Sequence, residues 1–143
     1  MCLLAGAVRA ESVCLSRLDL NFTALLRKAN RLSAPNDFQQ VFLRGKTLRN
    51  GPITMKFAKR ELGEGRFSFV TPTALSKHAV VRNKVRRRLR AIVRSLMSIP
   101  YPPFDVVLFA YKGAEDLSFA DLEAVVCELL QRAHIHFYKK TLL

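Results

Sequence analysis

The stretch from Arg82 to Arg94 constrains the fold of this chain more than any other. Seven of its thirteen residues are lysine or arginine and none is acidic. At about 100° per residue of an α-helix, the apolar side chains of this region lie within about 80° of one another. These side chains are Val81, Val85, Leu89, Ile92 and Leu96. The pattern predicts a helix with one face on a core and an opposite face that carries almost only positive charge, which is typical of a phosphate-binding surface.

A solvated charged face is the alternative interpretation of this helix. Surface helices usually mix both signs of charge along the polar arc. Here the pairs Arg86–Arg90 and Arg90–Arg94 place like charges at i,i+4, which destabilises a helix by a few tenths of a kcal/mol per pair. A helix that keeps such repulsion without a carboxylate favours binding to a polyanion.

Composition supports the same conclusion. The chain has 143 residues, of which 50% are hydrophobic, so it is long enough to bury one core. Its net charge is +13 and its pI is about 10.4, which predicts strong, salt-dependent attraction to a polyanion. The charge is segregated: residues 27–100 hold eighteen basic and three acidic side chains, whereas residues 101–135 hold two and six. The middle of the chain is therefore the expected binding region.

Several classes of site and location are disfavoured. The three cysteines are odd in number, widely spaced and without a Cys-x-x-Cys pair, and no histidine has a thiol or carboxylate at ligand spacing, so neither a disulfide framework nor a metal site is expected. No apolar run approaches the ~20 residues of a membrane span, and the short apolar stretch near the N-terminus lacks the features of a signal peptide. A reduced, cytoplasmic protein is expected, with no membrane partner and no evident protein partner.

Catalysis by the protein's own side chains is also not expected. The sequence has no Ser–His–Asp or Cys–His spacing and no Gly-rich phosphate loop. Its aspartates offer no convincing general acid–base pair, and Glu61 and Glu64 lie in a predicted turn.

The pattern along the chain predicts an α+β sandwich of one domain, residues 25–138, preceded by an extension of uncertain order (1–24) and followed by a short tail (139–143). Asn50-Gly51-Pro52 and the glycines at 63 and 65 predict turns, the second within a hairpin that joins the first two strands. The predicted elements are a helix over Ser33–Arg44, a strand from Ile53, a strand over Arg66–Thr71, the basic helix over Ala79–Met97, a buried strand over Val106–Ala110 and a helix from Ser118.

Three segments, in this order and spacing, resemble the protein component of bacterial ribonuclease P. They are KANRLSAPNDFQQVFLRGK at Lys28–Lys46, AVVRNKVRRRLR at Ala79–Arg90 and DVVLFAYK at Asp105–Lys112. The resemblance covers about Leu25 to Phe137. It implies a small α/β sandwich of the ribosomal protein S5 domain 2-like type, in which strand, basic helix and strand form a left-handed crossover, although general rules favour a right-handed one.

The resemblance also implies a function. The family protein binds the catalytic RNA of ribonuclease P and the 5′ leader of precursor tRNA, and it promotes endonucleolytic removal of that leader. The RNA performs the hydrolysis with Mg²⁺, which the RNA subunit and the substrate hold rather than a protein site. The expected partners are therefore the catalytic RNA and precursor tRNA.

Carried onto this chain residue by residue, the resemblance implies two sites. The RNA-binding signature falls on Arg82, Asn83, Lys84, Arg86, Arg87 and Arg90, and the leader cleft falls on Phe38 and Phe42. Without the resemblance, the i,i+4 spacing of the two phenylalanines equally favours a core role.

The chain departs from the family pattern at three places. Lys84 replaces an arginine and so lacks the planar fork for bidentate phosphate contact. Thr73-Ala74 replace a basic pair before the helix, where Lys77 and His78 are candidates to compensate, and Lys56 stands where an aromatic or neutral residue is expected.

Two other function classes stay open at this point. A ribosomal or other structural RNA-binding protein without a role in cleavage explains the charge and the fold. A DNA-binding protein with an arginine helix in the major groove explains the charge alone, since no helix-turn-helix pair or zipper is present.

Overall fold

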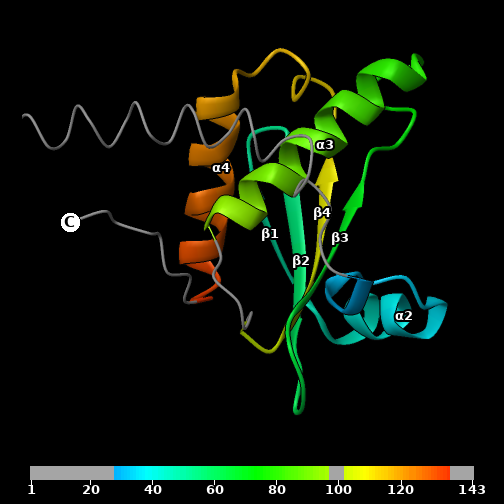
Figure 1. Cartoon of the computed structure of the whole chain (residues 1–143), viewed down its shortest axis with the longest axis vertical. Coiled ribbons are helices and arrows are strands. Elements are labelled where there is room, and N and C mark those ends of the chain that lie inside the picture. The colour runs from blue at the N-terminus through cyan, green and yellow to red at the C-terminus, as the bar shows by residue number, and fades with distance from the viewer. Residues whose placement is uncertain (1–27, 97–101, 136–143) are drawn as a thin grey trace, which may run out of the picture.

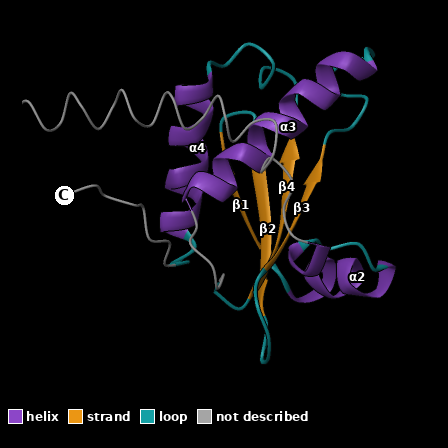
Figure 2. Cartoon of the chain, in the orientation of Figure 1, coloured by secondary structure: helices purple, strands orange, loops and turns teal. Residues whose placement is uncertain are grey.

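The computed structural model describes residues 28–96 and 102–135. The predicted extension 1–24 and tail 139–143 lie outside these residues. The elements, shown in Figures 1 and 2, are η1 (Lys28–Asn30), α2 (Pro35–Arg44), β1 (Lys46–Asn50), β2 (Ile53–Lys59), β3 (Arg66–Val70), α3 (Ala79–Leu96), β4 (Phe104–Ala110) and α4 (Phe119–Arg132). The expected α+β class is confirmed, as are the three predicted helices.

The strands form one mixed sheet in the order β1-β2-β4-β3. β1 pairs with β2 and β2 with β4 in antiparallel fashion, whereas β3 and β4 are parallel. The predicted hairpin between the strand from Ile53 and the strand over Arg66–Thr71 is wrong, because β4 lies between them. The turn at Asn50-Gly51-Pro52 closes a hairpin between β1 and β2 instead, with Gly51 in the left-handed region at φ 56°.

β1 was not predicted, and its sequence explains why. KTLRN contains one apolar residue, Leu48, and most of the strand is exposed. It lies at an edge of the sheet, where polar and charged side chains are common because they discourage pairing with other chains. The alternation that marks a half-buried strand is therefore missing.

α3 connects the parallel strands β3 and β4 by a left-handed crossover. In Figure 1 the helix lies in front of the sheet, both strands run upward, and β4 lies to the left of β3. This is the rare hand of such a connection, as the resemblance implied.

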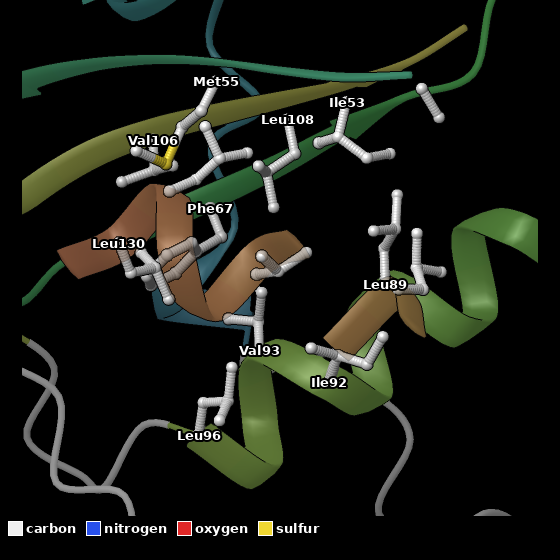
Figure 3. Close-up of a cluster of buried hydrophobic side chains, with 14 of the residues drawn as sticks. Ile53, Met55, Phe67, Leu89, Ile92, Val93, Leu96, Val106, Leu108 and Leu130 are labelled. Carbon is white, nitrogen blue, oxygen red and sulfur yellow. The ribbon is translucent and has the colours of Figure 1, made fainter. Parts of the chain in front are cut away.

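The main core lies between the sheet and the pair α3 and α4. Alternate residues of β2 and β4, among them Met55 and Leu108, face the predicted apolar stripe of α3 (Figure 3). In that stripe Val85, Leu89, Ile92 and Leu96 are buried, together with Val93, while Val81 is only partly buried. The apolar face of the basic helix is thus confirmed, and its charged arc is directed away from the core.

A second, smaller cluster lies on the opposite face of the sheet beneath α2. It consists of Leu32, Val41 and Val107, with Phe38 and Phe109 packed against it. An ion cluster fixes α2 to the sheet: Arg66 donates two hydrogen bonds to Asp105, at 2.9 and 2.8 Å, and one to Asp37 at 2.5 Å. A small apolar cluster and this ion cluster together hold the short helix on the sheet.

Candidate nucleic-acid interface

The polar arc of α3 holds all six residues of the predicted RNA-binding signature. Asn83, Lys84 and Arg87 are exposed, whereas Arg82, Arg86 and Arg90 are partly buried. Within residues 28–96 and 102–135, the arginines of this set have no carboxylate within 4.0 Å. The four signature arginines therefore form a dense group of cations without counter-charges in the described part of the chain.

Two side chains on α3 are held by neighbouring elements. Arg86 Nη2 donates a hydrogen bond of 2.8 Å to Thr71 Oγ1, just after β3. Arg88, which is not part of the signature, donates a hydrogen bond of 3.1 Å to the carbonyl of Leu117, just before α4. The first bond directs Arg86 toward β3, and the second assigns Arg88 a role in packing α3 against α4.

Positive charges surround the partly buried Arg90. Burial lowers the pKa of its guanidinium, and the nearby cations Arg31, Arg86 and Arg87 lower it further. An anion bound here would relieve both effects, because it replaces lost hydration and offsets the repulsion. The arc can thus bind phosphates through several arginines at once.

The opposite face of the sheet carries a row of aromatic side chains. The Phe42 ring, 45% exposed, meets Phe109 edge-on at a centroid distance of 5.9 Å. Phe109 stacks on Tyr111 at 6.4 Å with an interplanar angle of 15°. Lys56 Nζ lies 4.6 Å from the centre of the Phe42 ring, in a cation–π contact. We call Phe42, Lys56, Phe109 and Tyr111 the aromatic platform.

Strand register explains why these residues come together. Across β2 and β4, Lys56 pairs with Val107 and Thr54 pairs with Phe109. The side chains of these two pairs therefore point to the same face, the one beneath α2. α2 then brings Phe42 over the strands from one side. Phe38, one turn earlier, is partly buried against the small cluster.

Phe109 and Tyr111 were missed at the level of sequence. The run from Val106 to Ala110 indicates a strand buried on both sides, and that pattern hides which residues face a ligand. Alternation was the available signal, since Phe109 has the opposite parity to Val106, Leu108 and Ala110 and shares that of Tyr111.

Stacked rings beside cations are typical of surfaces that bind single-stranded nucleic acid. No group of three or more metal-binding side chains occurs among the residues described. No helix in the same part of the chain is long and apolar enough to cross a membrane.

Comparison with known proteins agrees with this geometry. The family model for ribonuclease P matches residues 26–134. The ribonuclease P protein component of Roseiflexus sp. (strain RS-1) is 36% identical over 111 residues, which are 77% of this chain and 90% of that protein. The one from Symbiobacterium thermophilum is 35% identical over 109 residues, or 76% of this chain and 94% of that protein.

Solved structures show the same fold. The RNase P protein from Thermotoga maritima superimposes with a TM-score of 0.62 at 27% identity, covering 71% of this chain and 96% of that one. The Staphylococcus aureus RNase P protein gives a TM-score of 0.66 at 22% identity, covering 76% and 98%. Together with the family match, these similarities show that the chain belongs to the ribonuclease P protein family, the protein component of an endoribonuclease.

Proposed function

We propose that this protein binds the catalytic RNA of ribonuclease P through the polar arc of α3 and the 5′ leader of precursor tRNA through the aromatic platform. The observation that supports this most is the placement of the two surfaces on opposite faces of one sheet. One RNA can therefore occupy each surface without displacing the other.

The contribution of the protein is electrostatic. Catalytic RNA and substrate are both polyanions, and a protein of net charge +13 between them offsets their repulsion. Each phosphate contact releases counterions, so the affinity falls steeply as salt increases. The exposed part of the arc, with Lys84 and Arg87, suits the regular backbone of a helical RNA, which proteins recognise by shape and phosphate position.

The leader is single-stranded and suits the aromatic platform. Phe42, Phe109 and Tyr111 offer rings for base stacking, which tolerates many base sequences. Lys56 adds a cation against the Phe42 ring, so this chain's leader contact is expected to depend on charge more than that of a relative with a neutral residue there. Phe38 supports Phe42 from the small cluster and contacts the leader, at most, by one ring edge.

Hydrolysis belongs to the RNA in this proposal. Mg²⁺, held by the RNA subunit and the substrate, supplies the metal-ion chemistry of phosphodiester cleavage. The residues of this chain bind and orient: Arg86 and Arg90 hold the catalytic RNA, and the platform holds the leader.

A cleavage assay tests the proposal. The full chain is mixed with a ribonuclease P RNA and precursor tRNA at low Mg²⁺, and release of the leader is followed. We expect strong stimulation by the wild type and at least a tenfold loss of affinity for the RNA in Arg86→Ala with Arg90→Ala, since charge-assisted contacts contribute about 1.5–3 kcal/mol each. Arg132→Ala, an exposed arginine on α4, is the control and should bind as the wild type.

The same assay tests the alternative functions. Tight binding to the RNA without any stimulation of cleavage would favour a structural RNA-binding protein. Salt-sensitive binding to duplex DNA alone would favour a DNA-binding protein. Either result would refute the proposed role in tRNA 5′ maturation.

A further inference from the structure

A hollow of about 190 Å³ opens between α3 and the outer edge of β3. Its lining combines different chemistries: Arg86 and Arg90 from the helix, the half-buried Phe69 of β3, and Leu32 and Phe67, which are almost completely buried behind the surface. It lies at the outer edge of β3 beside α3, whereas the aromatic platform lies over β2 and β4 on the face beneath α2. Neither the signature on α3 nor the leader cleft accounts for its apolar part.

The outer wall of the hollow is rigidly attached. The backbone N–H of Leu32 donates to the carbonyl of Phe67 at 3.0 Å, which adds a short parallel bridge to the edge of β3. Just before it, the buried Asn30 side chain donates to the Gly65 carbonyl and to Glu64 Oε2, both at 3.0 Å. The hollow is therefore preformed, which lowers the entropy cost of binding a ligand.

The edge of β3 directs backbone groups at the hollow. Because the Phe67 carbonyl bonds to Leu32 rather than to β4, the backbone groups of Phe67 point outward from the sheet. Backbone groups alternate sides along a strand, so the N–H and C=O of Phe69 point outward as well. An edge strand presents such groups to any partner that can pair with them.

The guanidinium side of the hollow is built for an anion. Arg86 Nη2 is fixed on Thr71, yet its Nε is buried and has no hydrogen-bond partner within the described part of the chain. A buried donor of this kind destabilises the folded protein unless an acceptor reaches it. The pKa of Arg90 is lowered by burial and by the cations around it, which is the condition that a bound anion removes.

We propose that this hollow binds one unstacked nucleotide of an RNA, with its phosphate on Arg86 and Arg90 and its base against the Phe69 ring. An inorganic phosphate would satisfy the arginines but leave the exposed part of the Phe69 ring in water, whereas a base covers that ring and can hydrogen-bond to the outward backbone of Phe69. The inference rests on the proposed function and deepens it: the arc of α3 recognises an unpaired nucleotide of the catalytic RNA as well as helical backbone.

The variant Phe69→Leu tests the base contact. Leucine keeps an apolar side chain on the core but removes the aromatic plane. We expect binding of the full chain to ribonuclease P RNA to weaken about tenfold, the order of one base–aromatic stack, while the slope of log K against log salt stays unchanged because no charge is lost. Phe104→Leu is the matched control, since Phe104 is also partly buried against the core but lies outside the hollow.

A second variant separates base from phosphate recognition. Arg87→Gln removes an exposed charge that does not line the hollow, so it should weaken binding and lower the salt slope by about 1. In a direct measurement, adenosine monophosphate should shift the amide resonance of Phe69 at concentrations where inorganic phosphate does not. Equal shifts with both probes would indicate an anion site only.

The outcomes distinguish the two proposals. If Phe69→Leu binds RNA as Phe104→Leu does, the nucleotide site is wrong even though the protein still stimulates cleavage. If the wild type neither binds the RNA nor stimulates cleavage, the proposed function itself fails.

Discussion

On one face of the sheet α3 and α4 bury a core that takes side chains from three strands, whereas on the other face the ten-residue helix α2 covers a cluster of three buried residues and leaves aromatic rings exposed. The first face is closed by apolar burial, which dominates folding free energy. The second is held by one short helix and an ion cluster. The difference indicates that stability resides mainly on the α3 side of the sheet, whereas the α2 side keeps the exposed rings to which the proposed function assigns the leader.

The matched pair Val106→Ala and Val107→Ala tests this difference with the largest expected effect. The two valines are neighbours on β4, both fully buried, and point to opposite faces. We expect Val106→Ala to lower the free energy of unfolding by about 2.5 kcal/mol, because the dense core cannot collapse around the cavity. Val107→Ala should cost about 1.5 kcal/mol, close to the transfer term alone, since α2 can relax.

Urea unfolding followed by circular dichroism measures both values. Equal losses for the two variants would show that the two faces are packed equally well and that stability does not reside mainly on the α3 side.

The ion cluster beneath α2 gives the next largest effect. Arg66 joins Asp37 of α2 to Asp105 of β4, and Asp105 is buried. Arg66→Met leaves that carboxylate without its main partner, so we expect a loss of about 2 kcal/mol, below the 3–5 kcal/mol typical of fully buried pairs. The control is Arg132→Met, which removes an exposed ion pair with Glu128 and should cost less than 1 kcal/mol.

If the ion cluster does not stabilise the fold, Arg66→Met and Arg132→Met would lower the free energy of unfolding by the same small amount. In that case the small apolar cluster alone would hold the helix.

The apolar stripe of α3 shows how much the sequence could predict. A period of 3.6 residues is kept in the segment VVRNKVRRRLR, residues 80–90, because one face of the helix must be buried whatever the ligand is. Val85, Leu89 and Ile92 are buried as expected. The crossover hand came from the resemblance alone, since the rule for parallel strands predicts the other hand.

The platform and the hollow show what the sequence could not predict. Alternation separates Phe109 and Tyr111 from the core side of β4, but that these rings meet Lys56 and Phe42 follows only from the register of β4 against β2 and from the place of α2. The hollow depends on the bridge between Arg31 and Phe67, a pairing between a loop and an edge strand that no local pattern announces. Sites built from several elements thus emerge only when the topology is known.

The variant Phe109→Leu tests whether the exposed rings of the α2 side contact the leader. We expect precursor tRNA to bind the holoenzyme about fivefold more weakly, a loss of about 1 kcal/mol, while mature tRNA, which has no leader, is unaffected. Phe38→Leu, at a position packed against the small cluster, should have a smaller effect on the leader-bearing substrate. Equal losses for precursor and mature tRNA would argue that Phe109 is only a packing residue.

The smallest expected effect is a pH dependence that originates at Asp37. The hydrogen bond from Arg66 lowers the pKa of this carboxyl below its usual value, with smaller help from the charges of Arg66 and Arg60. A carboxyl with a lowered pKa in the folded state stabilises the fold above its ordinary pKa of about 4, and this contribution disappears as the pH falls through the folded value. Because the group is accessible to water, we expect less than about 1 kcal/mol. Urea midpoints measured from pH 6 to pH 2.5 should therefore converge for the wild type and Asp37→Asn as the pH falls, whereas a constant gap would show that the ionised carboxylate does not help to hold α2 on the sheet.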